Sequence, residues 1–313
     1  LKEYGHWLEN LNTEEKKELE KIKNNDAEIK DRFYKALEFG TAGLRGVIGM
    51  GLNRMNVYVV GQATQGLANQ LIKTNPGRND LKVTIAYDSR HKSDEFAKTA
   101  ACVLAANGIK ALIFSELKPV PELSFSVRYK KADAGIAVTA SHNPAKYNGY
   151  KVYGNDGAQL GPEFASIVLD EIEKTDIFNG VKKCDFDDAV KSGMIEIMGD
   201  EVEEVYLDRV QEQCINPELI KEKGESLKFV YTPFHGTGNK PVRKILDRVG
   251  FKNVLVVKEQ ELPDGDFPTV KSPNPENKEG FKIAIELAKK NSADLIIGTD
   301  PDADRVGILV KDK

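Results

Sequence analysis

The sequence predicts an α/β protein built from two similar domains. From Leu81 onward, short apolar runs rich in β-forming residues alternate with segments of helical periodicity, which is the pattern of layered α/β structure. One order of elements, strand-helix-strand-helix-strand, occurs twice, and a polar loop follows the last strand each time. The length of 313 residues also exceeds the comfortable size of a single core. We expect domains at residues 1–200 and 201–313, with the boundary near Asp200.

The Lys/Glu-rich segment up to Phe39 is predicted to form one or two surface helices. Asn12-Thr13-Glu14-Glu15 resembles a capping signal at the start of a helix. Apolar residues then recur at roughly helical spacing, at Leu19, Ile22, Ile29, Phe33 and Leu37.

A glycine-rich segment with one arginine comes next, Phe39-Gly40-Thr41-Ala42-Gly43-Leu44-Arg45-Gly46. On these residues alone we favour a flexible turn, because glycine adopts backbone angles that are closed to other residues. The alternative is a backbone that approaches a phosphate closely, with Arg45 as its charged clamp.

Each α/β unit leads into a polar loop. The first unit is predicted as strand Val83–Tyr87, helix Ser93–Asn107, strand Ile109–Phe114, helix Glu122–Lys130 and strand Gly135–Val138. The second is predicted as strand Phe229–Thr232, helix Pro241–Val249, strand Val254–Val257, helix Glu276–Lys290 and strand Leu295–Gly298.

The two units also share a junction, because an Ala-Asp pair precedes the last strand of each, with Asp133 in the first and Asp294 in the second. We interpret the repeat as a duplicated domain. Ligands of open α/β sheets bind beyond the carboxyl ends of the strands, so the two polar loops are expected to face one cleft.

The remaining segments are assigned more simply. Helices are predicted at Glu163–Lys174 and Gly199–Cys214, a long loop at Leu262–Asn277 and a strand at Val306–Val310. The small-residue loop His235-Gly236-Thr237-Gly238 lacks the Gly-Lys-Ser/Thr of a P-loop, and it is either a structural turn or part of the lining of a site.

Composition argues against several classes of partner. Charged residues make up 30% of the chain, both signs are interspersed and the net charge is −4, so neither nucleic-acid binding nor attraction to a membrane surface is expected. No apolar run approaches the roughly 20 residues that span a bilayer, and the N-terminus does not resemble a signal peptide, so we expect a cytoplasmic protein. The cysteines form no CxxC, which indicates reduced thiols. The chain starts without Met and stops directly after an apolar run, so we expect it to be part of a longer protein.

Asp300, Asp302 and Asp304 alternate along the loop after the last strand of the second unit. Three carboxylates held on one side of a turn are costly without a cation, and hard oxygen ligands favour Mg²⁺ over calcium or manganese. An EF-hand is excluded, because its sixth and twelfth positions would be Arg305 and Lys311. A solvated acidic turn is the simpler alternative, and we disfavour it because apolar strands flank the loop directly.

A second alternative gives the chemistry to the aspartates themselves. A phosphatase-type Asp-x-Asp nucleophile would use Asp300 and Asp302, would also bind Mg²⁺ and would leave Ser141 a bystander. The third carboxylate, Asp304, and the adjacent Arg305 count only weakly against it.

The polar loop of the first unit is Thr139-Ala140-Ser141-His142-Asn143-Pro144. A serine at such a place is most often a cap or turn residue, and its hydroxyl is a good nucleophile only when a base, dipole or metal activates it. His142 is adjacent and Lys151 lies a short loop away, so a general acid/base and a phosphate partner are both near. The simplest interpretation of Lys151 is a surface charge, whereas burial would lower its pKa toward a basic role.

Three motifs, in this order, resemble those of the α-D-phosphohexomutases, the phosphoglucomutase and phosphomannomutase enzymes: 39–46, 139–144 and 298–305. The resemblance extends from Phe39 to the end of the chain. Segments 46–56, 87–93 and 234–246 look most like the phosphoglucomutase/phosphopentomutase branch. The resemblance implies three-layer α/β/α domains with mixed sheets, the first two of the four domains in that family.

The resemblance also implies a phosphoserine mechanism. Ser141 would be phosphorylated in the resting enzyme, and one Mg²⁺ per chain would be held by a phosphate oxygen on it and by Asp300, Asp302 and Asp304. The phosphoryl group would pass to a sugar monophosphate, with glucose most expected. The resulting bisphosphate, glucose 1,6-bisphosphate, would turn over in the cleft and return its other phosphate to the serine.

The resemblance gives supporting roles to four further residues. Arg45 and Arg305 would contact phosphate, Lys151 would act in proton transfer near the serine and His142 would support the loop. Positive charge of this kind offsets negative charge as the phosphoryl group moves.

In that family, the loops that recognise the sugar and the second phosphate belong to the third and fourth domains, beyond Lys313. We therefore expect this chain to keep the serine and the metal but to turn over substrate poorly or not at all. Whether the sugar is glucose, mannose or a pentose is left open, as is the oligomeric state. Two other functions also remain open, a metal-dependent aspartyl phosphatase and a non-catalytic phosphosugar sensor.

Overall fold

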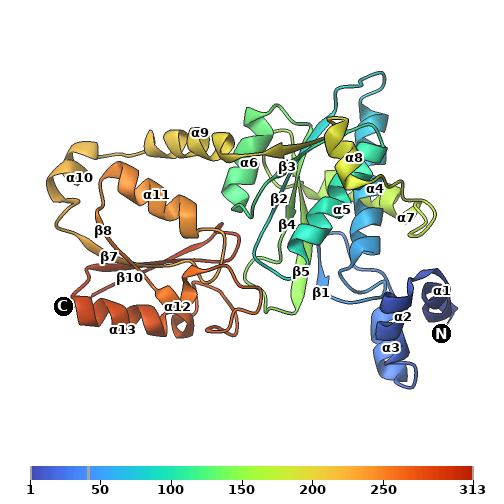
Figure 1. Ribbon diagram of the computed structural model, residues 1–313, viewed down its shortest axis with the longest axis horizontal. Helices are drawn as coiled ribbons and strands as arrows, with labels where there is room; N and C mark the ends of the chain where they lie inside the picture. Colours follow the sequence, from blue (N-terminus) through green and yellow to red (C-terminus); the bar gives the residue numbers. More distant parts are fainter. Residues whose placement is uncertain (1, 41–42, 312–313) are drawn as a thin grey trace.

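The computed structural model describes residues 2–40 and 43–311, which fold around two separate β-sheets (Figure 1). Thr41 and Ala42 of the glycine-rich motif lie outside the described residues. The strands of the first sheet are β1 Leu44–Val47, β2 Lys82–Tyr87, β3 Lys110–Phe114, β4 Ala134–Val138, β5 Tyr147–Gly154 and β6 Ile195–Met198. Those of the second are β7 Lys228–Thr232, β8 Asn253–Val256, β9 Leu295–Thr299 and β10 Val306–Val310.

Helices connect these strands. Those before residue 200 are α1 Lys2–Asn10, α2 Thr13–Glu20, α3 Asp26–Phe33, α4 Val57–Thr74, α5 Ser93–Ala106, α6 Val120–Tyr129, α7 Pro162–Glu173 and α8 Phe186–Lys191. Those from residue 200 onward are α9 Asp200–Gln211, α10 Pro217–Lys223, α11 Asn239–Val249, α12 Lys258–Glu261, the 3₁₀ helix η1 Lys278–Phe281 and α13 Lys282–Asn291.

The two sheets repeat one topology. The order is β1-β5-β4-β2-β3-β6 in the first sheet and β10-β9-β7-β8 in the second. Strands β4, β2 and β3 are parallel, as are β9, β7 and β8, whereas the strand after each polar loop, β5 or β10, is antiparallel to its neighbour. Both sheets are therefore mixed and order their equivalent strands alike. The predicted α/β fold with a duplicated unit is confirmed.

The shared Ala-Asp junction has the same contacts in both units. The Asp133 carboxylate accepts a hydrogen bond of 2.9 Å from the backbone N–H of Lys82, and the Asp294 carboxylate accepts one of 2.9 Å from that of Lys228. Each aspartate in turn donates its own N–H to the carbonyl of that lysine. The junction therefore ties the start of the third strand to the start of the first, which is a structural role.

Helices cover both faces of each sheet. Helices α4 and α5 lie on one face of the first sheet and α6 lies on the other, while α11 and α13 lie on opposite sides of the second sheet (Figure 1). Successive strand residues alternate between the faces, so Ile85 and Ile136 enter one apolar cluster while Ala86 and Ala137 enter another. The result is two three-layer α/β/α domains.

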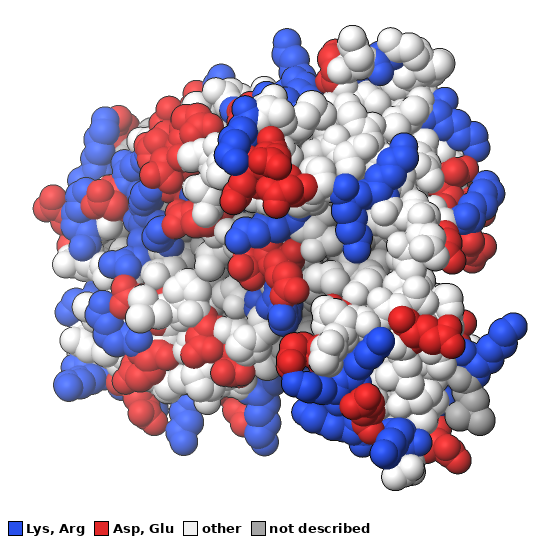
Figure 2. Space-filling model, turned by 45° about the vertical axis from the view of Figure 1, so that its right-hand side comes forward, with Lys and Arg blue, Asp and Glu red and all other residues white. Residues whose placement is uncertain are grey.

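Charges of both signs share the surface. Lys and Arg side chains are interleaved with Asp and Glu over the face shown in Figure 2. Exposed charges also form local pairs, such as Lys17–Glu14. Such exposed pairs contribute little to stability, about 0–1 kcal/mol each. Among the described residues, no helix is both long enough and apolar enough to cross a membrane.

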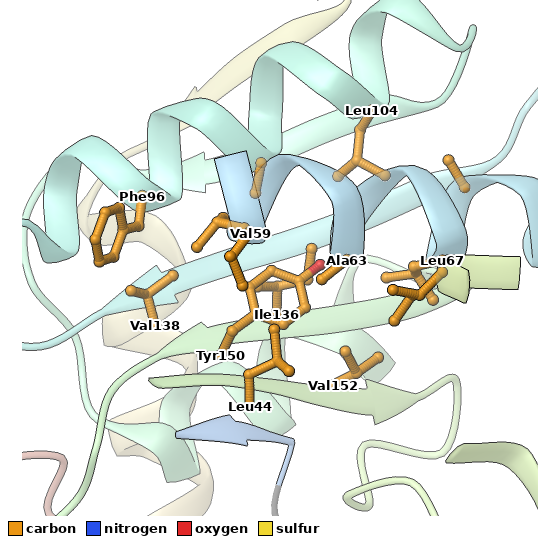
Figure 3. Packing of buried hydrophobic residues seen from close by; sticks show 14 of the residues in the cluster. Leu44, Val59, Ala63, Leu67, Phe96, Leu104, Ile136, Val138, Tyr150 and Val152 are labelled. Carbon is orange, nitrogen blue, oxygen red and sulfur yellow. The ribbon is translucent and has the colours of Figure 1, made fainter. Parts of the chain in front are cut away.

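The largest apolar core lies between the first sheet and helices α4 and α5 (Figure 3). Tyr150 of β5 points into it toward Val59 and Ala63 of α4, and its hydroxyl accepts a hydrogen bond of 3.0 Å from Thr64 Oγ1. A buried phenol needs such a partner. The burial of Tyr150 fixes the register of β5 and thereby sends the next side chain, Lys151, to the opposite face of the sheet.

Three helices precede β1, where one or two surface helices are predicted. Their inner faces are buried, because Trp7 has no exposed surface and its ring meets Tyr58 and Phe178 edge to face. The predicted cap is present at α2, where the Asn12 side chain accepts from the N–H of Glu15 and the Glu15 carboxylate accepts from the N–H of Asn12. The three are therefore surface helices with one buried face, and the difference from the prediction is their number, three instead of one or two.

The structure also contains β1, α4, β5 and β6, which the sequence analysis does not predict. The interpretation of residues 146–151 as a short loop is wrong, since β5 runs through them. Asn148 and Gly149 are weak β formers, but β5 pairs with β1 on one side and β4 on the other, and this pairing overrides local propensity. The helix predicted at Glu276–Lys290 begins later, with η1.

Helix α9 connects the two sheets. It packs against α6 of the first domain and α11 of the second (Figure 1). The boundary near Asp200, the first residue of α9, stays a prediction.

Candidate functional site

The two polar loops meet between the sheets. Ser141, which follows β4, donates a hydrogen bond of 3.0 Å from Oγ to the Asp300 carboxylate, which follows β9. The same hydroxyl lies 3.1 Å from Nδ1 of His142. Both Ser141 and Asp300 are buried. The structure thus brings the serine to the acidic loop, although 159 residues separate them in sequence.

Ser141 has an unusual backbone conformation. Its φ angle is +53°, in the left-handed region that is unfavourable for a residue with a side chain. The backbone N–H of Ser141 donates to Thr139 Oγ1 at 2.8 Å, and this hydroxyl in turn donates to Asp302 at 3.1 Å. Strained residues of this kind gather at functional sites, and here the strain directs the serine side chain toward the acidic loop.

The three aspartates form one cluster, here called the triad. One carboxylate oxygen of each of Asp300, Asp302 and Asp304 lies within 4.8 Å of the others. The first two are buried and Asp304 is partly exposed. Oxygen Oδ1 of Asp302 is buried and has no hydrogen-bond partner. Convergent, incompletely satisfied carboxylates suit a hard divalent cation, so the triad fits Mg²⁺.

The two buried carboxyl groups of the triad differ in pKa. Burial, together with the neighbouring carboxylates of Asp302 and Asp304, raises the pKa of Asp300. Burial would also raise the pKa of Asp302, but the charge of Lys151 and the hydrogen bonds accepted by the Asp302 carboxylate outweigh burial, so this pKa is lowered. Without a cation, the triad therefore concentrates more negative charge than its surroundings neutralise.

Lys151 is the cationic partner within the site. It is almost fully buried, and its Nζ donates to Asp302 at 2.9 Å and to Asp304 at 3.4 Å. Burial alone would lower its pKa, but Asp302 and Asp304 raise it, so the amine stays protonated. The interpretation of Lys151 as a surface charge is therefore wrong, and its pKa is not lowered toward a basic role.

Arg45, His142 and Arg305 lie around the serine. Arg45 donates to the Asn143 side chain at 3.2 Å, and the Arg305 guanidinium pairs with Glu276 at 3.0 Å. The backbone N–H of Arg305 donates to the Asp300 carboxylate at 3.0 Å. Burial and the charges of Arg305 and Arg45 lower the pKa of His142, so its imidazole is neutral near pH 7.

The His235 loop packs behind the acidic loop. Thr237 donates both its N–H and its hydroxyl to the carbonyl of Pro301, at 2.8 and 2.9 Å. A Cβ on Gly236 would collide with the Pro301 backbone, so this position requires glycine. Of the two interpretations offered by the sequence, these contacts support the structural turn, which holds the acidic loop from behind.

The first domain also binds the acidic loop directly. The N–H of Val120, at the start of α6, donates to the Asp302 carbonyl at 2.9 Å. From the second domain, Ser272 donates its hydroxyl to the His142 carbonyl at 2.8 Å. Each domain therefore holds the loop of the other.

Sequence reasoning misses Asp88 and Arg90, which directly follow β2. Both are buried, and Arg90 donates to the backbone of the loop at residues 139–144, here called the serine loop. The signal was present, because polar residues at the carboxyl end of a central parallel strand lie where ligands bind.

Fold and site together define a class of protein, one in which two duplicated α/β/α domains bring a buried serine against an acidic, cation-compatible loop. The family model for phosphoglucomutase/phosphomannomutase, α/β/α domain I, matches residues 36–177, and that for domain II matches residues 204–313. The chain belongs to this family, the α-D-phosphohexomutases.

Individual relatives agree with this assignment. A phosphoglucomutase of Staphylococcus saprophyticus is 39% identical over 97% of this chain and 53% of its own length. A phosphoribomutase of Saccharomyces cerevisiae is 39% identical over 91% of this chain and 47% of its own length. The crystal structure of a proposed phosphomannomutase from Thermus thermophilus has the same fold, with a TM-score of 0.73 and 24% identity over 88% of this chain and 57% of that one. The chain spans about half the length of the curated relatives that it matches.

Proposed function

We propose that this chain carries the phosphoryl-transfer half of a sugar-phosphate mutase, an isomerase that interconverts sugar 1-phosphates and 6-phosphates through a phosphoserine at Ser141. The observation that carries the proposal is the 3.0 Å contact between Ser141 Oγ and Asp300, since it places a buried hydroxyl beside a cluster suited to a divalent cation. Membership in the phosphohexomutase family supports it.

The triad would hold one Mg²⁺ per chain, with Ser141 completing the site through a phosphate oxygen when it is phosphorylated. The unpartnered Oδ1 of Asp302 and the convergence of the three carboxylates support this assignment. When bound, Mg²⁺ would offset negative charge on the phosphoryl group during transfer.

The transfer needs a donor and an acceptor oxygen in sequence. In the first step the bond between Ser141 Oγ and phosphorus breaks while a hydroxyl oxygen of the sugar monophosphate bonds to that phosphorus, and the proton of that hydroxyl passes by way of neutral His142 to the leaving Ser141 Oγ. In the return step Ser141 Oγ attacks the other phosphate of the bisphosphate, and its proton goes to Asp300 at 3.0 Å or to neutral His142 at 3.1 Å. The same group would then give that proton to the leaving sugar oxygen, and Lys151 stays protonated beside the triad, where it would offset negative charge.

Arg45 and Arg305 would bind the phosphate that is not being transferred. The Arg45 guanidinium donates to the Asn143 side chain and that of Arg305 pairs with Glu276, and neither pairs with the triad. A guanidinium can bind two phosphate oxygens at once, so the substrate phosphate would replace Asn143 and Glu276 as the partners of these arginines.

Glucose phosphate is the first substrate to test, with glucose 1,6-bisphosphate as intermediate and activator. The similarity to a phosphoglucomutase supports this choice, while the similarity to a phosphoribomutase keeps phosphopentomutase activity as an alternative. Phosphomannomutase activity is the third possibility within the family.

Peptide mass spectrometry tests the proposal. After incubation with Mg²⁺ and glucose 1,6-bisphosphate, the peptide that contains Ser141 is expected to gain one phosphate, and Ser141→Ala is expected to gain none. The proposal fails if the wild-type chain takes no phosphate from the 1,6-bisphosphates of glucose and mannose or from ribose 1,5-bisphosphate. Phosphate on Asp300 in the Ser141→Ala variant would instead indicate the aspartyl phosphatase. Phosphosugar binding without isomerisation by the protein containing all its domains would indicate a sensor.

A further inference from the structure

We propose that Arg90 is the positioning residue of the phosphotransfer site, and that it holds Ser141 in its left-handed backbone conformation by binding the carbonyl groups of the serine loop. The inference rests on the proposed function for its catalytic consequence. Its structural basis is separate, because it consists of contacts within this chain.

The Arg90 guanidinium is buried, and its two Nη atoms donate to backbone carbonyl groups of residues 141–147. Its Nη2 donates to the carbonyls of Ser141 at 2.5 Å and Asn143 at 2.6 Å. Its Nη1 donates to the carbonyls of Pro144 and Tyr147, each at 3.0 Å. A guanidinium is the side chain with enough fixed donors for four such acceptors.

These contacts fix the peptide groups on both sides of Ser141. Its N–H is bound to Thr139 Oγ1 at 2.8 Å, and its carbonyl is bound to Arg90 at 2.5 Å. With both neighbouring peptide planes held, the φ angle of +53° is maintained although it is unfavourable for serine. This backbone conformation directs Oγ toward Asp300.

Among the described residues, no other side chain binds as many carbonyls of the serine loop. The carbonyls of residues 141, 143 and 144 accept from Arg90, and the carbonyl of His142 accepts from Ser272 of the second domain. The carbonyl groups of residues 141–144 therefore all accept hydrogen bonds from side chains outside the loop, and Arg90 donates to three of them.

Arg90 is itself held from two directions. Its Nε lies 3.2 Å from the Asp88 carboxylate, whose other oxygen accepts hydrogen bonds from the Arg90 N–H and the Ser93 hydroxyl. On the other side the ring of Phe267, from the second domain, lies 5.0 Å from the centre of the guanidinium. The arginine therefore couples the serine loop to the first sheet and to the second domain.

The conservative substitution Arg90→Lys separates charge from geometry. Lysine keeps the positive charge beside Asp88, but its single ammonium cannot reach four carbonyls in different directions. We expect Ser141 phosphorylation by glucose 1,6-bisphosphate to slow by about 10- to 100-fold, since small displacements of a reacting group have effects of this size. Mg²⁺ affinity is expected to stay unchanged, because Arg90 does not touch the triad.

The experiment measures the rate of Ser141 phosphorylation by quenched-flow mass spectrometry and Mg²⁺ affinity by calorimetry. Amide hydrogen exchange across residues 139–147 is followed in parallel, because loss of the Arg90 hydrogen bonds should speed exchange there. Arg54→Lys is the matched control, since Arg54 is a buried arginine that binds Glu28 and Asp31 away from the site. It is expected to change neither the rate nor the exchange of the serine loop.

Recovery of the rate separates positioning from general folding. Added guanidinium or methylguanidinium ion is expected to restore part of the rate in Arg90→Ala and none in Ser141→Ala. If Arg90→Ala does not fold, Phe267→Leu, which removes the covering ring and keeps the arginine, is expected to show a smaller slowing and faster exchange at 139–147.

Wild-type rate and wild-type exchange in Arg90→Lys would overturn the inference. If wild-type protein takes no phosphate, the proposed function fails instead, and the exchange measurement alone then decides the role of Arg90. Exchange at 139–147 that is unchanged in both Arg90→Lys and Phe267→Leu would then reject it.

Discussion

Two clusters of acids, each with two buried members, lie among the described residues, and they neutralise their charge in different ways. In the triad, Lys151 donates to Asp302 and Asp304. Asp300 accepts hydrogen bonds from Ser141 Oγ and the Arg305 N–H. A second cluster, here called the junction cluster, lies where α6, α9 and α11 meet and combines glutamates with lysines from both domains: Glu116, Glu122, Glu203, Lys118, Lys240 and Lys244.

Lysines of the chain itself pair with two acids of the junction cluster, Glu116 and Glu203. Glu203 is almost fully buried and accepts hydrogen bonds from Lys118 and Lys244. Burial would raise the pKa of Glu203, but the two lysines outweigh burial and lower it. Glu122 has no hydrogen-bond partner for either carboxylate oxygen, and burial raises its pKa to about 8. Lysines and one bound proton therefore remove the negative charge.

The triad shares one feature with the junction cluster, since burial and the neighbouring carboxylates raise the pKa of Asp300, but its carboxylates pair with one lysine, Lys151. They also converge, with Oδ1 of Asp302 unpartnered, whereas Glu116 and Glu203 of the junction cluster each pair with two lysines. Within residues 2–40 and 43–311, the triad is the only group of three or more candidate ligand side chains whose ligand atoms approach this closely. Burial and incomplete hydrogen bonding are thus not enough to indicate a cation site, because Glu122 shows both, and the convergence of three carboxylates is what distinguishes the triad.

The largest expected effect is on cation binding. Asp302→Asn removes the carboxylate with the unpartnered oxygen, so Mg²⁺ affinity measured by calorimetry should fall by at least about 100-fold. The matched control is Glu203→Gln, which removes a comparably buried carboxylate from the junction cluster and should leave Mg²⁺ affinity unchanged. Equal Mg²⁺ affinity in wild type and Asp302→Asn would remove the distinction between the clusters.

Stability should show the opposite pattern. Glu203→Gln removes the nearest carboxylate of buried Lys118 and leaves it Glu116 at 3.2 Å and Asp200 at 4.0 Å, so the free energy of unfolding should fall by about 3 kcal/mol. Asp302→Asn, measured without divalent cations, relieves repulsion within the triad while also weakening the Lys151 contact, so its loss should be smaller. Urea unfolding of both variants gives the comparison. A larger loss for Asp302→Asn than for Glu203→Gln would contradict it.

Removal of the metal should have a defined size. A ligand that binds only the folded state stabilises it by about 2.7 kcal/mol at a concentration of 100 times its Kd. Wild-type protein saturated to this degree with Mg²⁺ should lose this increment on addition of a chelator, and Asp302→Asn should lose almost none at the same Mg²⁺ concentration. Thermal or urea unfolding with and without chelator measures both, and equal losses would place the cation elsewhere.

The sequence was sufficient for the parts of this molecule that local pattern determines. The apolar strands, the duplication and both polar loops follow from residue order, and the motifs around Ser141 and Asp300 indicated the family. Strand β5 and the contacts of Arg90 with the serine loop could not be predicted from residue order, because their stability comes from partners far away in sequence. Gly149 is a poor strand former until β1 and β4 pair with β5, and the acceptors of Arg90 are backbone carbonyls 51 to 57 residues away.

The smallest expected effect is the pH dependence of the junction cluster. Glu122 lies among Lys118, Lys244, Glu116, Glu203 and Tyr206, and its pKa is raised to about 8 by burial. In the unfolded chain the pKa of a glutamate is about 4.3. Its contribution to stability is therefore fully present below about pH 4 and is lost as pH rises toward 8, because the unfolded chain releases the proton first.

Glu122→Gln stays neutral at every pH, so it should remove this slope. We expect wild-type protein to lose about 2 kcal/mol more than Glu122→Gln between pH 5.5 and 8.5, less than the full shift allows because part of the titration of the unfolded chain lies below pH 5.5. Urea unfolding at the two pH values measures the difference. Glu201→Gln, at an exposed position of α9, is the control and should keep the wild-type slope. Parallel pH profiles for wild type and Glu122→Gln would show that this acid is not neutralised by a bound proton.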